Sequence, residues 1–135
     1  MPAACGSWQL SIHLSQQEFS DLAAEALRSL PGEFAGRMEN VSVEIQPLPE
    51  AKLLRSMKLS RDVRLLGVYS GVPMTRKSVL SPVDWPERII IFQRNVEAVC
   101  GTRRDIIRQV QRTVLHEVGH HFGLTEDDLR RLGYG

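Results

Sequence analysis

Residues 113–132 read TVLHEVGHHFGLTEDDLRRL, and this stretch decides the fold that we expect. Its first half continues a helical pattern that Thr102 can cap, with Asp105 in the first turn and Gly123 as the stop signal. One side of this helix is apolar, which predicts a face packed against a core. The apolar stripe consists of Ile106, Ile107, Val110, Val114 and Val118.

His116 and His120 stand four residues apart on this helix, so their side chains lie one above the other on the same face. Two imidazole nitrogens placed in this way can bind one tetrahedral metal ion. Glu117 is rotated by about 100° from His116, so its carboxylate borders the metal without competing to bind it. The pattern H-E-x-x-H on a helix is typical of zinc metallopeptidases. The stripe around Val114 and Val118 faces the core, and the two histidines lie outside this stripe. Their side chains are therefore not needed for packing and can face a cleft.

A catalytic zinc ion needs a third protein ligand beside an open position for water, and Gly123 lets the chain turn sharply after the helix. Glu126 follows His116 by ten residues and completes the spacing H-E-x-x-H-x-x-G-x-x-E. We therefore predict that His116, His120 and Glu126 bind Zn²⁺, with Asp127 as the alternative third ligand. A structural interpretation competes with this one, because acidic residues are favoured in the first turn of a helix.

A chance pentapeptide on a solvated helix face is the alternative interpretation of the two histidines. His121 lies close to the apolar stripe, where a histidine is more often packed or hydrogen-bonded than bound to metal, so we do not assign it to the metal. Four arginines share the helix with acidic groups in a near-neutral protein, which predicts a solvated face rather than a basic patch. They are Arg103, Arg104, Arg108 and Arg112.

Further helices are expected on both sides of this stretch. Ser15 and Glu18 form a capping box before a helix with apolar residues at helical spacing. Residues 34–38 add a helical turn, and residues 50–57 have modest helical character. A short last helix is expected within residues 125–132, where Thr125 and Asp128 provide the capping pair.

Two strand patterns and one continuous apolar run predict a small sheet. Residues 41–45 alternate between apolar and polar side chains, as a first strand would. Residues 65–70 form a second strand pattern, which is weaker because Gly67 lies inside it. A strand weakened in this way suits the edge of a sheet. The apolar run at residues 89–92 is typical of a strand that is buried on both faces, in the middle of a sheet. Residues 75–85 show no period and are expected to form a loop near the site.

The composition indicates one ordinary globular domain of 135 residues, 42% hydrophobic and 24% charged. Lys plus Arg is 17 and Asp plus Glu is 16, so the excess positive charge typical of nucleic-acid binding is absent. No apolar run approaches the roughly 20 residues that span a bilayer. We expect a cytoplasmic monomer with no nucleic-acid or membrane partner. Cys5 and Cys100 are expected to be free thiols, Cys100 as a buried small residue, and residues 8–14 suggest a short extended segment.

Residues 113–132 resemble the small bacterial zincin-like metallopeptidases, also called mini-zincins. The resemblance continues upstream. Residues 66–73 look like that family's Gly-x-Tyr-x-Gly-x-Pro segment, and residues 87–92 look like the strand that follows it. Residues 19–31 are similar to the family's opening helix.

This resemblance covers roughly residues 15–132 and leaves residues 1–14 as an N-terminal extension of a single domain, residues 1–135. It implies an α+β minimal zincin fold, in which a small twisted mixed β-sheet packs on an N-terminal helix and on the helix with the active-site motif. An edge strand, which we assign to residues 65–70, would border the cleft where an extended peptide aligns. The family usually has Asp where this chain has Glu126, which keeps a carboxylate but lengthens it by one methylene.

These features predict a zinc-dependent, metallopeptidase-like protein that hydrolyses peptide bonds in a peptide or protein substrate. Zinc would activate a water molecule, and Glu117 would be the catalytic general base. Tyr69, Tyr134 and His121 are candidates for stabilising the oxyanion. Two alternatives stay open. One is a zinc-binding regulatory or protein-interaction domain with weak or no catalysis, and the other is a metal-free module whose sheet edge recruits a partner strand.

Overall fold

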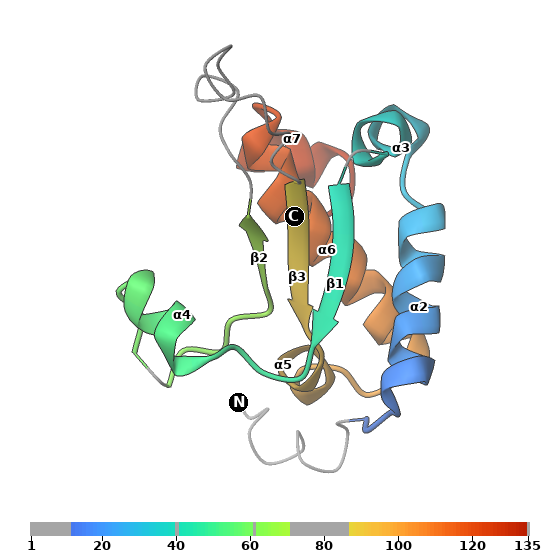
Figure 1. Cartoon of the computed structure of the whole chain (residues 1–135). Helices are drawn as coiled ribbons and strands as arrows, with labels where there is room; N and C mark the ends of the chain where they lie inside the picture. The colour runs from blue at the N-terminus through green and yellow to red at the C-terminus, as the bar shows by residue number, and fades with distance from the viewer. Residues whose placement is uncertain (1–11, 40, 61, 71–86, 135) are drawn as a thin grey trace.

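The computed structural model describes residues 12–39, 41–60, 62–70 and 87–134 (Figure 1). The described part consists of helices and a three-stranded mixed sheet, which confirms the expected α+β class. None of the helices in this part has the length and apolar character needed to cross a membrane. In chain order the elements are α2 (Gln16–Arg28), α3 (Gly32–Met38), β1 (Val41–Gln46), α4 (Ala51–Ser56), β2 (Gly67–Ser70), β3 (Glu87–Phe92), α5 (Gln93–Ala98), α6 (Arg103–His121) and α7 (Glu126–Arg131).

The sheet has the strand order β1-β3-β2, so β3 lies in the middle. β1 runs parallel to β3 and pairs Val43 with Ile89, whereas β2 runs antiparallel to β3 and pairs Tyr69 with Ile89. Ile89 and Ile91 belong to the main core, and Ile90 points to the opposite face but is also buried. The central strand buried on both faces and the edge position of β2 are therefore confirmed.

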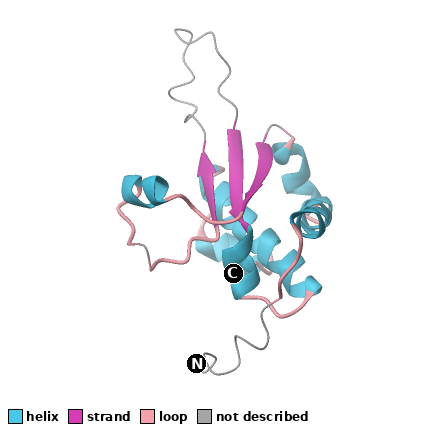
Figure 2. Cartoon of the chain, turned by 60° about the horizontal axis from the view of Figure 1, so that its bottom comes forward, coloured by secondary structure: helices cyan, strands magenta, loops and turns pink. Residues whose placement is uncertain are grey.

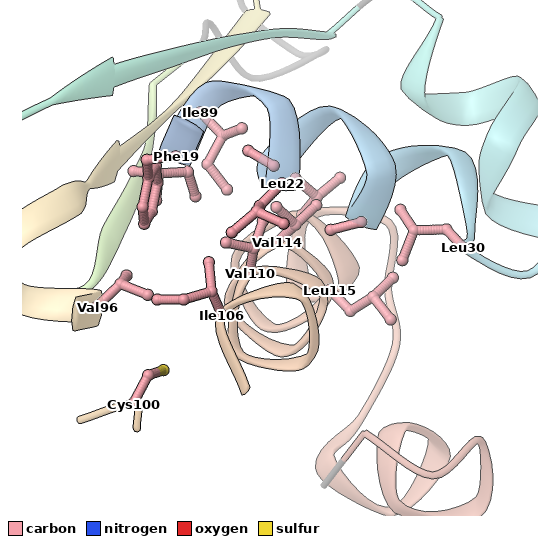
Figure 3. Packing of buried hydrophobic residues seen from close by; sticks show 14 of the residues in the cluster. Phe19, Leu22, Leu30, Ile89, Val96, Cys100, Ile106, Val110, Val114 and Leu115 are labelled. Carbon is pink, nitrogen blue, oxygen red and sulfur yellow. The ribbon is translucent and has the colours of Figure 1, made fainter. Parts of the chain in front are cut away.

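The core lies between the sheet and a layer formed by α2 and α6, which pack against each other. Figure 3 shows Phe19 and Leu22 of α2 close to Val110 and Val114 of α6, with Ile89 of β3 beside them. Burying side chains of this size contributes roughly 1.5–3 kcal/mol each. This packing therefore sets the rotation of α6 about its own axis. Of the predicted stripe, Ile106, Val110, Val114 and Val118 are buried, and Ile107 is half-buried.

A capping box begins α2, as the sequence predicts. The backbone N–H of Glu18 donates to Ser15 Oγ at 3.1 Å, and the N–H of Ser15 donates to Glu18 Oε1 at 3.0 Å. The second carboxylate oxygen of Glu18 accepts a hydrogen bond at 2.7 Å from Arg103, the first residue of α6. This bond, together with those from Ser15, lowers the pKa of Glu18 from 4.5 to about 2. One carboxylate thus caps α2 and ties it to the start of α6.

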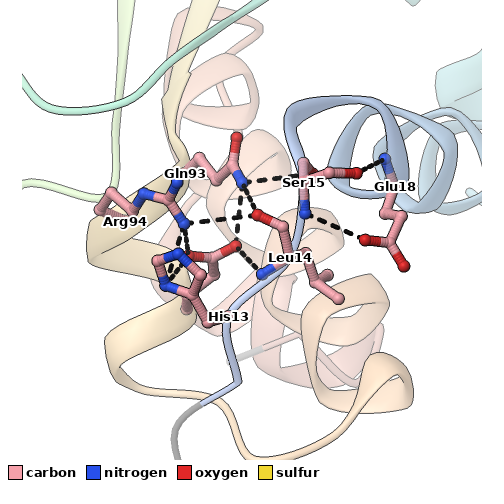
Figure 4. A network of polar contacts seen from close by, with 7 residues as sticks. His13, Leu14, Ser15, Glu18, Gln93 and Arg94 are labelled. Atoms are coloured by element: carbon pink, nitrogen blue, oxygen red, sulfur yellow. Dashed lines mark hydrogen bonds and ion pairs between the residues drawn. The ribbon is translucent and has the colours of Figure 1, made fainter.

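The segment before α2 is attached to α5 through a buried carboxylate (Figure 4). Glu97 Oε2 accepts hydrogen bonds from the N–H of Leu14 at 3.0 Å and from the Gln93 side chain at 2.9 Å. Glu97 Oε1 accepts one from Arg94 at 2.8 Å. The sequence did not predict α5, because six residues that include buried Gln93 and Glu97 present no apolar stripe.

The expected extended segment at residues 8–14 is described only from Ile12 onward. The N–H of Ile12 donates to the carbonyl oxygen of Cys100 at 3.0 Å, and Leu14 lies in the core. Neither residue is part of the described sheet. The rest of this segment and the expected loop at residues 75–85 lie outside the described residues.

β2 begins at Gly67, later than the predicted start at residue 65. The carbonyl oxygen of Leu65 accepts a hydrogen bond from the Asn95 side chain at 2.8 Å, so α5 and not a strand provides its partner. The segment that enters β2 therefore runs over α5. Figures 1 and 2 show α4 to the side of β2, away from the layer of α2 and α6.

Candidate metal centre

The rotation of α6 decides which side chains leave the core. Leu115 is 1% exposed and packs in the core, which makes the buried face wider than the predicted stripe. The next residue, His116, is 29% exposed and lies at the edge of that face. The helix starts as predicted, because the N–H of Asp105 donates to Thr102 Oγ at 3.0 Å. Packing and capping together therefore place His116 where a ligand can reach it.

Both ring nitrogens of His116 have a neighbour. Nε2 lies 2.9 Å from the carbonyl oxygen of Tyr134, and Nδ1 lies 3.5 Å from Oε1 of Glu126. A carbonyl oxygen can only accept a hydrogen bond, so Nε2 carries a proton and donates it to Tyr134. Nδ1 then faces a carboxylate oxygen of Glu126. A metal ion between these two atoms would be bound by both of them.

A tight turn between α6 and α7 brings Glu126 to His116. Gly123 has a φ of +87°, a left-handed conformation that favours glycine, and the N–H of Leu124 donates to the carbonyl oxygen of Gly119 at 2.8 Å. Gly119 also allows close packing, because a Cβ there would lie 3.3 Å from Leu124 Cδ1. The predicted role of Gly123 in turning the chain is confirmed by this geometry.

A second left-handed glycine brings the carbonyl of Tyr134 to the same histidine. Gly133 has a φ of +91°, and the N–H of Tyr134 donates to the carbonyl oxygen of Leu129 at 2.9 Å. Leu129 is fully buried, so α7 is anchored while its two ends approach His116. Sequence reasoning missed this contact, because a backbone carbonyl has no residue signature. In the sequence, only the glycine after Leu132 indicates that the chain turns here.

The three acidic residues at the start of α7 have different partners. Asp128 accepts a hydrogen bond from the N–H of Thr125, which is the main cause of the lowered pKa of this carboxyl group. Asp127 forms an ion pair with Arg130. Glu126 is the one that faces His116. The capping interpretation thus accounts for Asp128, and the ion pair with Arg130 engages Asp127.

The distance between His116 and Glu126 fits a shared zinc ion. With bonds of 2.0–2.2 Å and tetrahedral angles, two ligand atoms on one zinc lie about 3.4 Å apart. The observed separation of Nδ1 and Oε1 is 3.5 Å. The backbones of His120 and His121 belong to α6, but their side chains lie outside the described part. Among the described side chains, no three of His, Cys, Asp and Glu form a metal-binding group.

A groove of about 340 Å³ lies beside His116, between α6 and the segment that enters β2. Glu117 is half-buried and lines it together with His116. The walls are residues 64–67 on one side and a face of α6 on the other. They approach closely at Gly67, where a Cβ would lie 2.7 Å from Thr113 Cγ2. The absence of a side chain at Gly67 therefore lets the edge strand pass directly over α6.

One of the four arginines on α6 departs from the predicted solvated face. Arg103, Arg104 and Arg108 are exposed, as expected. Arg112 is half-buried and lines the groove, so the prediction was wrong for this residue. The segment leading into β2 lines the same groove as Arg112, and helical periodicity alone does not reveal this neighbour.

Two tyrosines and one cysteine remain to be considered as groups with a chemical role. Burial, with a contribution from the Glu87 carboxylate, raises the pKa of Tyr69 to about 12, and Tyr69 is not among the residues that line the groove. Tyr134 contributes its backbone carbonyl to His116, and its hydroxyl group, which can donate a hydrogen bond, stays a candidate for the oxyanion. Cys100 is buried as expected, and burial with nearby Asp105 and Glu97 raises the pKa of its thiol to about 12. This thiol stays protonated and is no nucleophile.

Comparison with known proteins adds one positive finding. The model of a family described as zincin-like metallopeptidase matches residues 38–135. This range includes the sheet, α6 and α7, and leaves α2 outside the match. A search of curated proteins found no significant match.

Proposed function

Because the chain belongs to the zincin-like metallopeptidase family, we propose that it is a zinc-dependent peptidase that hydrolyses peptide bonds. The observation that carries the proposal is the position of Glu126, whose Oε1 lies 3.5 Å from Nδ1 of His116. This is the separation that two ligands of one zinc ion require. The third expected ligand is His120, one helical turn after His116 on α6.

Two imidazoles and one carboxylate are a donor set that suits zinc and leaves a coordination position open. His116, His120 and Glu126 would hold the zinc ion, which would polarise a peptide carbonyl and lower the pKa of a water molecule toward about 7. The carbonyl of Tyr134 keeps the proton of His116 on Nε2, and Nδ1 is the ring nitrogen that faces Glu126. This contact supports Nδ1 as the ligand atom.

Glu117 is the proposed general base. Its carboxylate accepts a proton from the attacking water as the water oxygen bonds to the carbonyl carbon, and it then donates that proton to the departing amine nitrogen. The place of Glu117 beside His116 on the groove wall supports this role. β2, the edge strand next to the groove, offers backbone groups that an extended peptide can pair with.

Zinc content and peptide cleavage test the proposal together. Elemental analysis should find one zinc ion per chain, and a mixed peptide library should be cut by the wild type but not by Glu117→Gln. Retained cleavage by this variant contradicts the mechanism. Stoichiometric zinc without cleavage by the wild type favours a zinc-binding regulatory domain instead. A protein that binds no zinc favours the metal-free interaction module.

A further inference from the structure

Two arginines lie on the walls of the groove beside Glu117. Arg112 is on α6, one helical turn before His116. Arg64 is on the segment that enters β2, which forms the facing wall. The groove thus has a cationic end at the two arginines and a catalytic end at His116 and Glu117.

Among the described residues, no carboxylate pairs with either of these arginines. Other arginines of the described part do form ion pairs: Arg88, Arg94, Arg103, Arg130 and Arg131. Within the same described residues, Arg64 and Arg112 have neither an ion pair nor a hydrogen bond, and Nε of Arg112 is buried without an acceptor. The terminal N–H groups of the two guanidinium ions are therefore available to a ligand in the groove that accepts hydrogen bonds.

The chemistry of the walls favours an anionic group. Arginine binds carboxylates through parallel hydrogen bonds as well as charge. Leu65 and Leu66 line the same groove, and apolar surroundings strengthen such a bond by lowering the local dielectric constant. With zinc bound, the carboxylates of Glu117 and Glu126 would offset the positive charge of the metal ion at the catalytic end. An anionic ligand group is therefore directed toward Arg64 and Arg112.

Helix geometry gives the distance from this group to the reacting bond. Arg112 precedes His116 by four residues, which is about 6 Å along a helix. An extended peptide advances about 3.3 Å per residue. A carboxylate held at Arg112 would therefore belong to a residue within about two positions of a peptide bond held at His116.

We propose that Arg64 and Arg112 form a carboxylate subsite, and that the preferred substrates are peptides with an acidic group within about two residues of the cleaved bond. The proposal rests on the peptidase function proposed above. The carboxylate comes either from an Asp or Glu side chain or from a free peptide C-terminus. Both sources present the same group to the guanidinium ions.

Matched peptides test the subsite. One series of acetylated and amidated alanine-rich peptides carries a single Glu at successive positions, and a second series carries Gln in its place. A third series keeps Gln but ends in a free carboxylate. We expect kcat/KM of the wild type to be at least about tenfold higher for the best acidic peptide than for its neutral match, as expected for a charge-assisted bond. The better of the Glu and free-carboxylate series identifies the source.

Substitutions at the two arginines then assign the preference. Arg112→Gln should reduce the ratio of acidic to neutral rates to about one while the neutral peptide is still cut, and Arg112→Glu should reverse it. Arg64→Gln changes an exposed side chain and should reduce the ratio in part, which protects the test against a folding defect in Arg112 variants. Arg104→Gln, an exposed arginine on the same helix, is the control and should leave the ratio unchanged.

Binding to zinc-free protein separates this proposal from the proposed function. Fluorescence anisotropy with labelled Glu and Gln peptides should show tighter binding of the acidic peptide, and the difference should fall with added salt. Acidic preference in binding without any cleavage supports the subsite and contradicts the peptidase. Cleavage with equal rates for acidic and neutral peptides overturns the subsite and leaves the peptidase intact.

Discussion

Glu126 and Asp127 are neighbouring carboxylates with different surroundings, which makes them a matched pair. Glu126 faces His116, whereas Asp127 pairs with Arg130. We predict that Glu126→Gln lowers zinc affinity by at least about tenfold, because a neutral amide replaces a charged ligand, and that Asp127→Asn changes the affinity far less. Competition with a chromophoric chelator measures both. Equal losses in the two variants would remove Glu126 from the ligand set.

At the residue scale, the sequence predicts those contacts that depend on the spacing of residues along the chain. The ten-residue separation and Gly123 were enough to expect Glu126 near His116, and the structure places them 3.5 Å apart. The carbonyl of Tyr134 and the burial of Arg112 were not predictable in this way. Both depend on a second segment packed against α6, which the helix pattern itself does not encode.

At the element scale, the crossing of β2 over α6 depends on Gly67. We predict that Gly67→Ala lowers the free energy of unfolding by about 1–3 kcal/mol, the usual cost of overpacking. The added Cβ would lie 2.7 Å from Thr113 Cγ2 and 3.1 Å from the carbonyl oxygen of Ile90. Urea denaturation measures the loss. Thr113→Ser, which removes the opposing methyl group, should recover part of it in the double variant, and strictly additive effects would argue against this contact.

The start of α2 and the start of α6 are joined by an acid-sensitive link. The pKa of Glu18 is lowered from 4.5 to about 2, chiefly by Arg103. Its stabilising effect is therefore complete above about pH 4.5 and is lost as pH falls toward about 2. We predict that Glu18→Gln flattens the fall in melting temperature across this window. Arg103→Gln should do the same, and a wild-type slope in both variants would contradict the link.

Elements with a strong local sequence pattern were predictable, and the helix α5, which lacks such a pattern, was not. The capping box of α2, the apolar run of β3 and the stripe of α6 each encode their element locally. α5 is held by hydrogen bonds that buried Glu97 accepts from Leu14 and Gln93. Leu14 is distant in sequence, and Gln93 is not part of any apolar pattern. Tertiary structure, and not local periodicity, creates that helix.

For the whole molecule, zinc should act as a clamp between α6 and α7. A ligand that binds only the native state stabilises it by about 2.7 kcal/mol at 100 times its Kd. For a domain of this size we therefore predict a rise in melting temperature on the order of 10 °C in excess zinc. Differential scanning fluorimetry with zinc, and then with a chelator, measures it. Glu126→Gln at the same zinc concentration should show a smaller rise, and an identical rise would contradict the clamp.

The overall architecture follows from residues whose spacing is recognisable in the sequence. Ile89 and Ile91 of β3, the α6 stripe and the apolar face of α2 define a two-layer core, and the glycine in β2 marks the sheet edge. The mutual placement of the layers decides where the groove opens, and that placement depends on contacts between distant segments. The family match begins at residue 38 and does not include α2, whose apolar spacing and capping box predict its contribution to the core.

The contact between the Tyr134 carbonyl and His116 also bears on how the protein is produced for study. A polyhistidine tag fused after residue 135 would start within two residues of this carbonyl. At about 3.8 Å per residue, its imidazoles would reach His116 and compete for the same zinc ion. Recombinant protein for zinc stoichiometry should therefore carry its tag before residue 1, or have it cleaved off before metal is added.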